Sequence, residues 1–95
     1  MGRQMKSSIM HGLNEALERV REAHTAKSSS LDLSDMALVT LPEGIRNLIH
    51  LEQLDLSDNN LIEMRGIDRL VQLRFLNLSN NKLKYIPKTI GNLSV

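Results

Sequence analysis

The start of the chain carries apolar side chains at the spacing of an amphipathic helix. They recur three or four positions apart at Ile9, Leu13, Leu17 and Val20, with Ala16 and Ala23 beside them. Charged residues occupy the positions in between, at Glu15, Glu18, Arg19, Arg21 and Glu22. This period predicts an α-helix of about 15 to 18 residues within segment 1–27. Ser7 or Ser8 is expected to cap its start.

Beyond residue 27 the order of apolar and polar positions repeats. The clearest copies are segments 51–61 and 73–83, which share leucines at their first, fourth, sixth and last positions. A degenerate copy covers 28–38. Leu31, Leu54 and Leu76 hold equivalent positions, so one unit is 22 or 23 residues long, a length typical of solenoid repeats. The sequence therefore predicts three units, at 28–50, 51–72 and 73–95.

Each unit predicts a short strand followed by a return segment. Leucines two positions apart point to the same face of a strand. Such pairs are Leu31 and Leu33, Leu54 and Leu56, and Leu76 and Leu78. One unit cannot bury these side chains alone, but units stacked with parallel strands can. Parallel strands need a crossover, which we expect the return segment to form as a 3₁₀-helix or a single helical turn.

Two asparagines, Asn59 and Asn81, share one position of the repeat, where the chain turns inward. Backbone polar groups that leave water must find partners. An asparagine side chain carries both a donor and an acceptor on a short stem. We therefore expect these amides to bond the backbone of their own turn and of the next. The first unit has Met36 here, as befits an atypical terminal unit beside a cap.

These motifs resemble the leucine-rich repeat family, whose consensus LxxLxLxxNxL is met in full at 51–61 and 73–83. The resemblance covers 28–95. It implies an α/β leucine-rich repeat solenoid with a short parallel β-sheet on its concave face, 3₁₀ or helical return segments, and an N-terminal capping helix at 1–27.

The repeats resemble two subtypes of that family. The pairs Leu41-Pro42 and Ile86-Pro87 are similar to intracellular, Ras-suppressor-type repeats. Segment 62–70 of the middle unit lacks proline and resembles the 22-residue units of the phosphatase-regulator and dynein-light-chain groups. The resemblance implies a cytoplasmic member.

Composition narrows the function classes. A net charge of +1 gives no strong electrostatic attraction for the phosphates of nucleic acid. Phe75 and Tyr85 are the only aromatic residues, too few for a surface on which bases stack. The chain has no cysteine, and its three histidines are scattered, so we expect no metal and no cofactor. The N-terminus has no apolar run as long as that of a signal peptide, and no apolar run is long enough to span a membrane. We therefore expect no membrane contact and a cytoplasmic location.

The resemblance places partner binding on the concave strand face, where the non-leucine strand positions point outward. Three rows follow from the alignment of the units. The first contains Ser30, Gln53 and Phe75, and the second contains Asp32, Asp55 and Asn77. The third contains Ser34, Ser57 and Ser79, with Asp35, Asp58 and Asn80 at its edge. The third row is ordinary repeat consensus, and we expect its role to be structural. Basic residues are expected on the convex side or its edges, at Arg46, Lys82, Lys84 and Lys88.

Two features of these rows point to a partner. An aromatic side chain on a rigid face is a common interface anchor, so Phe75 is a candidate, although it could instead pack on Gln53 and Arg74. The acidic residues Asp32, Asp35, Asp55 and Asp58 favour a basic partner through charge complementarity. The alternative is that these carboxylates only keep the face solvated.

The sequence therefore predicts a protein-interaction module without catalytic activity. One alternative is a regulatory subunit of an enzyme such as a protein phosphatase. Another is a structural N-terminal cap of a longer repeat protein. Ile90, Leu93 and Val95 close the last unit with no cap after them. This predicts a truncated or uncapped array, which is either a fragment, a chain that self-associates through this edge, or a natural or designed miniature.

Overall fold

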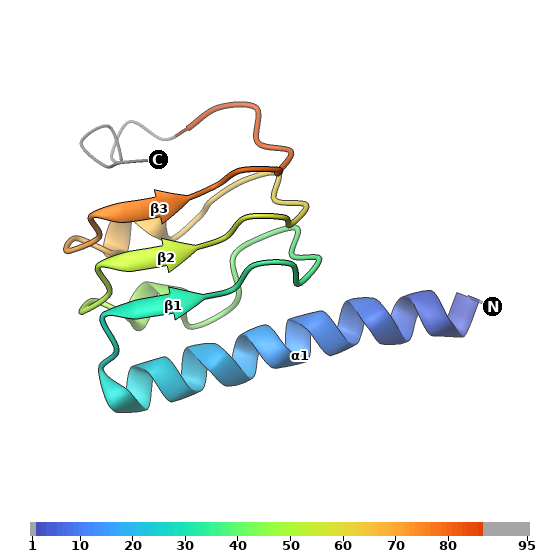
Figure 1. The fold of residues 1–95 in the computed structure, drawn as a ribbon, viewed down its shortest axis with the longest axis horizontal. Coiled ribbons are helices and arrows are strands. Elements are labelled where there is room, and N and C mark those ends of the chain that lie inside the picture. The colour runs from blue at the N-terminus through green and yellow to red at the C-terminus, as the bar shows by residue number, and fades with distance from the viewer. Residues whose placement is uncertain (1, 87–95) are drawn as a thin grey trace.

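The computed structural model describes residues 2–86, with side chains described from residue 11 onward. One long helix, α1 (Gly2–Ala26), precedes three short strands, β1 (Ser30–Asp32), β2 (Gln53–Asp55) and β3 (Phe75–Asn77). The 3₁₀-helices η1 (Ile45–Asn47) and η2 (Ile67–Arg69) lie on the return segments. The strands form a single sheet in the order β1-β2-β3, and α1 runs beside β1 (Figure 1).

The three strands pair in parallel and in the expected register. Leu31 is opposite Leu54, which in turn is opposite Leu76. Beyond the strands the pairing continues, since the N–H of Leu33 donates to the carbonyl of Asp55 over 2.8 Å. The predicted parallel sheet is thus confirmed, and so are the 3₁₀-helices of the first two return segments.

We call each repeat unit a coil: the first is 28–50, the second is 51–72, and the third is described from 73 to 86. Leucine side chains fill the interior that these coils share. The largest fully buried side chains are Leu33, Leu51, Leu56, Leu61 and Leu76. Burying one leucine contributes roughly 1.5–3 kcal/mol, so the repeated leucines dominate the packing energy. Met64, Ile67 and Leu70 close the same interior from the return segment.

The return segments turn at glycine. Gly44 and Gly66 directly precede η1 and η2, with φ angles of 91° and 100°. Side chains disfavour this left-handed backbone, so glycine is the residue that fits it. Two repeats therefore enter their 3₁₀-helix through the same turn.

The two asparagine amides bond the backbone of their own turn, as predicted, but the expected bonds to the next turn are wrong. Asn59 Oδ1 accepts the N–H groups of Met36 and Leu38, at 3.0 and 2.9 Å, and its Nδ2 donates to the carbonyl of Leu33. All three belong to the preceding coil. Asn81 bonds the second coil in the same way, since its Oδ1 accepts the N–H of Leu61 over 2.9 Å. The neighbour that each amide reaches is the preceding coil, not the following one.

Helix α1 is longer than its apolar period predicts. It begins at Gly2, so the expected cap at Ser7 or Ser8 is wrong, and it has 25 residues. No proline interrupts residues 2–26, and serine is tolerated inside a helix, so nothing in that segment ends the helix early.

The apolar stripe of α1 is only partly buried. Ala16, Val20 and Ala23 lie in the core, whereas Leu13 is 43% exposed, contrary to the expected apolar face. The reason is a close approach at Gly12, where an added Cβ would overlap the carbonyl oxygen of Met36. Small residues bring the helix backbone onto the first coil, and the larger Leu13 remains at the border. The side chain of Ile9 lies outside the described residues.

Helix α1 ends in a left-handed residue, Lys27, with φ of 51°. The N–H of Ser28 donates to the carbonyl of Ala23 at 3.0 Å, and that of Lys27 donates to His24 at 3.3 Å. This pair of bonds is a Schellman motif, which satisfies carbonyls at a helix end. It turns the chain directly into β1. The expectations about Pro87, Lys88, Ile90, Leu93 and Val95 fall outside the described residues.

A candidate protein-binding face

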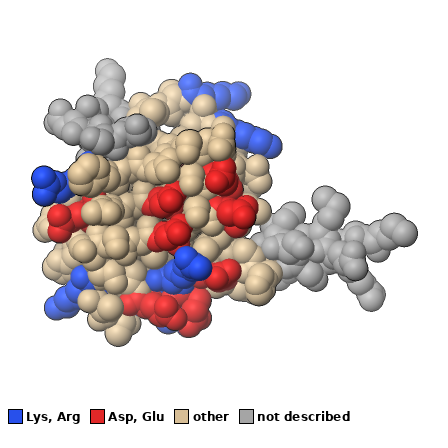
Figure 2. Space-filling view, in the orientation of Figure 1, with Lys and Arg blue, Asp and Glu red and all other residues tan. Residues whose placement is uncertain are grey.

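The outward side chains of β1, β2 and β3 form one continuous surface, which we call the strand face (Figure 2). The register places Ser30, Gln53 and Phe75 side by side, and likewise Asp32, Asp55 and Asn77. These six residues, with the three central leucines, line a hollow of about 540 Å³. Neighbouring strands lie less than about 5 Å apart, so each row is contiguous.

Phe75 is the most prominent apolar group of the strand face. It leaves 51% of its surface open, while its neighbour Leu76 is buried. Its backbone is fixed, because its N–H donates to the carbonyl of Glu52 over 3.0 Å. The adjacent Arg74 meets Glu52 at only 4.0 Å and stays 70% exposed. Half of the ring therefore faces solvent from a rigid strand.

The second row, Asp32, Asp55 and Asn77, forms turns at the carboxyl ends of the three strands. Asp32 Oδ1 accepts the N–H of Ser34 over 2.8 Å, and Asp55 Oδ1 accepts both the N–H and the hydroxyl of Ser57, at 2.9 and 2.7 Å. Asn77 holds Ser79 in the same way. These are Asx turns, in which an aspartate or asparagine bonds the backbone two residues on. The row thus has a structural role that sequence reasoning missed.

The serine row does not lie uniformly outward as expected. Ser57 is buried, Ser34 is half-buried and Ser79 is exposed. Ser57 turns its hydroxyl back to Asp55, which removes it from the surface. The alternation of strand side chains ends with β2 at Asp55, so a two-residue period no longer predicts the direction of Ser57.

Asp32 is held in its charged form. The side chain and N–H of Ser34 donate to its carboxylate, and with the nearby Arg19 guanidinium they lower its pKa below the ordinary value of 3.8. Arg19 also donates to the carbonyl of Asp32, 2.9 Å away, and to Glu15. This arginine therefore ties α1 to the edge of the sheet.

A third line of polar residues borders the strand face. Asp35, Asp58 and Asn80 have φ angles of 54°, 57° and 59°. Aspartate and asparagine tolerate this left-handed backbone better than most residues. Asn80 donates to Asp58 over 2.7 Å. The turn chemistry explains these residue types without any ligand, and it also leaves acidic side chains gathered on this side (Figure 2).

The described residues hold no group of three or more histidine, cysteine, aspartate or glutamate side chains that could bind a metal ion. Between residues 2 and 86, no helix is long and apolar enough to cross a membrane.

The coil architecture and the asparagine contacts define a repeat protein built on the leucine-rich pattern. The family model for the leucine-rich repeat matches residues 29–83, more than half of the chain, and this chain belongs to that family. Leucine-rich repeat domains generally mediate protein–protein interaction and are typically not enzymes.

Among curated proteins, the chain is similar to plant intracellular Ras-group-related LRR protein 8 of Arabidopsis thaliana, at 42% identity over 68% of this chain and 18% of that protein. It is also similar to the human volume-regulated anion channel subunit LRRC8A, at 38% identity over 73% of this chain and 9% of the subunit. A third relative is the adenylate cyclase of Schizosaccharomyces pombe, at 41% identity over 66% of this chain and 4% of that enzyme. The chain spans less than a fifth of each relative.

Proposed function

We propose that this chain is a protein-binding module of a cytoplasmic leucine-rich repeat solenoid, and that its partner occupies the strand face. The observation that carries the proposal is a half-open aromatic ring, Phe75, fixed on the wall of a hollow of about 540 Å³. An isolated exposed aromatic is ordinary on a surface, but one in a rigid hollow matches the aromatic anchors of interfaces.

Polar groups beside the ring give the hollow its selectivity. Gln53 is aligned with Phe75 on the neighbouring strand, and Asn77 follows two residues later on the same strand. Gln53 offers both an amide donor and a carbonyl acceptor. We infer that Phe75 contributes most of the binding energy, and that Gln53 and Asn77 fix the orientation of the partner.

The charge of the strand face favours a basic partner. Asp32 and Asp55 lie side by side on β1 and β2, and Asp35 and Asp58 lie at the border. The Asx turns use Oδ1 of Asp32 and of Asp55 and leave both side chains charged. Lysine or arginine of a partner would find complementary charge here, and steering would speed its association.

The solenoid is supported by the regular relation between successive repeats, and its cytoplasmic location by one relative. The strands keep one register over both steps, and each asparagine reaches back by one coil. The Arabidopsis relative is named as an intracellular protein. Whole-protein activities of the relatives do not transfer, since the chain spans only a small part of each.

The test uses the chain as bait, with quantitative mass spectrometry of cross-linked partners. Phe75→Ala is compared with Val71→Ala, which removes another exposed apolar side chain away from the strand face. We expect Phe75→Ala to reduce the recovery of a partner at least tenfold, while Val71→Ala leaves it unchanged. Equal recovery by both variants, with folding intact by circular dichroism, would exclude the strand face as the binding site.

The charge is tested separately with Asp55→Asn. This variant keeps the Asx turn, because Asn77 makes the same contacts in the third coil. The negative charge alone is removed. We expect the same partner to associate more slowly and with a weaker dependence on salt. An unchanged salt dependence would contradict a basic partner and leave the role of Phe75 intact.

A further inference from the structure

A small cavity lies between the end of α1 and the residues that lead into β2, and we call it the histidine cavity. Its volume is about 160 Å³, and its lining comes from segments 23–28 and 47–50. It therefore joins the last turn of the helix to the end of η1 and the turn after it. None of its lining residues lines the strand-face hollow, so the histidine cavity is a separate site.

Every polar side chain of the histidine cavity can donate a hydrogen bond. His24, Lys27 and Ser28 come from the first segment, and Asn47 and His50 come from the second. None of the described lining residues is acidic. Among residues 11–86, no carboxylate lies within 4.0 Å of the ring nitrogens of either histidine or of the Lys27 ammonium. The cavity thus gathers donors around a positive charge that has no counter-charge beside it.

The backbone of the histidine cavity is fixed on both sides. The Schellman motif at Lys27 holds the first segment. In the second segment, the N–H of Leu51 donates to the carbonyl of Leu48 over 3.0 Å. Ala23 and Leu48, which are buried, form the base. Carbonyls at a helix end disfavour an anion, but the Schellman motif gives two of them N–H partners, which weakens that effect.

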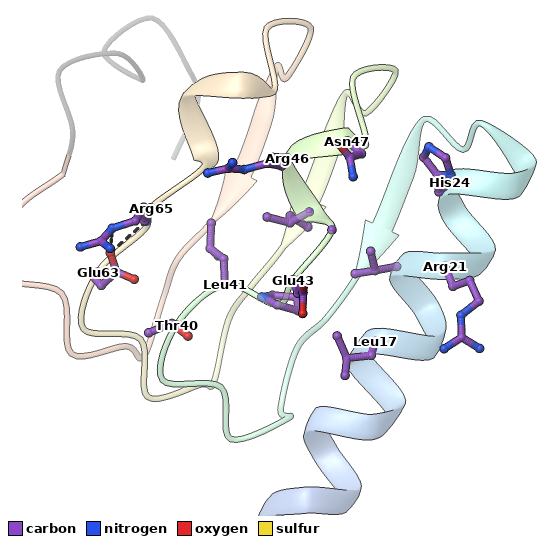
Figure 3. A pocket seen from close by; sticks show the side chains of 14 residues that line it. Leu17, Arg21, His24, Thr40, Leu41, Glu43, Arg46, Asn47, Glu63 and Arg65 are labelled. Carbon is purple, nitrogen blue, oxygen red and sulfur yellow. Dashed lines mark hydrogen bonds and ion pairs between the residues drawn. The ribbon is translucent and has the colours of Figure 1, made fainter.

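A larger depression between α1 and residues 40–47 borders the histidine cavity, and His24 and Asn47 line both (Figure 3). The charges of this depression are balanced, because two glutamates lie among its arginines. One of them, Glu63, meets Arg65 at 3.6 Å. We therefore expect a preference for anions at the histidine cavity and not at the larger depression.

We propose that the histidine cavity binds a phosphoryl group, presented by free phosphate or by a phosphorylated side chain. Each water molecule of the liquid takes about 30 Å³, so the cavity has room for roughly five heavy atoms, the number in phosphate. A phosphoryl group carries three acceptor oxygens and roughly two negative charges at neutral pH. Its oxygens can accept hydrogen bonds from donors on both sides of the cavity, and such bonds are strengthened by the charge.

Two other classes of ligand fit the histidine cavity less well. A carboxylate has only two oxygens and a single charge, so it leaves more of the donors unused. Zinc sites use three or four protein ligands, whereas this cavity offers two imidazoles, and the Lys27 ammonium repels a cation. The inference does not depend on the proposed strand-face function, because the two sites share no residue.

The test titrates the 95-residue chain with sodium phosphate at neutral pH and constant ionic strength, and it follows the imidazole signals by NMR. His24 and His50 should shift along one saturable curve, whereas His11, at another position of α1, should not shift. Lys27→Gln should weaken binding about tenfold, the usual effect of losing one charge-assisted hydrogen bond. Lys82→Gln is the matched control, since it removes the same charge from an exposed position of the third coil, and it should leave the affinity unchanged.

A second titration separates the two sources of the phosphoryl group. It uses the peptide Gly-Ser-Leu-Gly with phosphate on its serine, and the unphosphorylated peptide should not bind. Tighter binding than that of free phosphate identifies a phosphorylated side chain as the ligand, because the half-exposed Ile49 at the cavity then contacts the leucine of the peptide. Equal affinity identifies free phosphate.

Asn47→Asp provides an independent variant, because it places a carboxylate in the cavity at almost unchanged side-chain size. It should abolish the shifts, while the amide signals of the buried leucines show that the fold is kept. Shifts without saturation, equal shifts of all three histidines, or equal effects of Lys27→Gln and Lys82→Gln would overturn the proposal. Phe75→Ala should leave phosphate binding unchanged, so failure here and failure of the strand-face proposal are distinguishable.

Discussion

The side-chain oxygen of Asn59 accepts the backbone N–H of Met36, 3.0 Å away and one coil earlier in the chain. The two residues occupy the same position of successive repeats, yet they act differently. Asn59 is buried and bonds backbone groups of both coils, whereas Met36 contributes only apolar volume beneath α1. The first coil is therefore fastened by the second, and the helix covers its other side.

Among the polar residues of segment 11–86, Asn59 should be the one whose replacement by alanine costs the most stability. This substitution leaves buried N–H and C=O groups of two coils without partners, at about 1–3 kcal/mol for each group. We expect urea denaturation to show a loss of about 3 kcal/mol or more. Asn81→Ala is the control, because Asn81 is half-buried and makes fewer contacts. Equal losses for the two variants would contradict the dependence on burial.

Gly12→Ala should destabilise the protein, although alanine ordinarily stabilises a helix by about 0.5–1 kcal/mol relative to glycine. The added Cβ would overlap the Met36 carbonyl oxygen, which belongs to the backbone and cannot rotate away. Thermal denaturation should show a loss of about 1–3 kcal/mol, as for other overpacked contacts. Asn14→Ala, at an exposed position of the same helix, should be neutral or stabilising. A stabilising Gly12→Ala would mean that α1 does not rest on the first coil.

Gly44→Ala should cost more stability than Gly66→Ala. Both residues have a positive φ, so each substitution carries a backbone cost of about 1–2 kcal/mol. An alanine Cβ at Gly44 would also press on Val20 at 3.3 Å, whereas at Gly66 the closest atom lies at an ordinary 3.8 Å. Denaturation of both variants under identical conditions tests the order. The reverse order would show that α1 yields at this contact.

Phe75→Ala should scarcely change stability, while Leu76→Ala should lower it by about 2–5 kcal/mol. The two residues are neighbours on β3, but one is half-open and the other is buried. A loss below about 1 kcal/mol for Phe75→Ala is expected of a surface position. A large loss would favour the alternative that Phe75 serves packing on Gln53 and Arg74.

The Asp32 carboxylate should titrate below its ordinary pKa of 3.8. A lowered folded-state pKa means that the ionised form stabilises the fold. That contribution is complete well above 3.8 and is lost as the pH falls through the folded-state pKa. Carboxyl carbon chemical shifts measured against pH give the midpoint. Ser34→Ala should raise the pKa more than Arg19→Ala does, because hydrogen bonds from Ser34 are the largest cause.

The repeat period of the sequence predicted those features that occur at equivalent positions in all three coils. Leu31, Leu54 and Leu76 align because one apolar rule governs all three coils, and the outward rows follow from that register. Turn chemistry was harder, because Asp55 and Ser57 read as ordinary surface residues until their side chains are seen to bond each other. Their pairing depends on a local backbone turn that a strand period does not describe.

Contacts between elements that occur only once were missed for a different reason. The approach of α1 at Gly12 and the depression between α1 and residues 40–47 both involve the single helix of the described residues. No second copy of that contact exists among the repeats to reveal it. The expected helix face failed at Leu13 on the same ground, since the helical period fixes a side but not the distance to its neighbour.

The backward reach of Asn59 also orders the steps of folding during synthesis. A ribosome makes the first coil before residue 59 exists, so that coil emerges with the N–H groups of Met36 and Leu38 still bonded to water. Each later coil then locks the one made before it, and order advances along the nascent chain with a lag of one repeat.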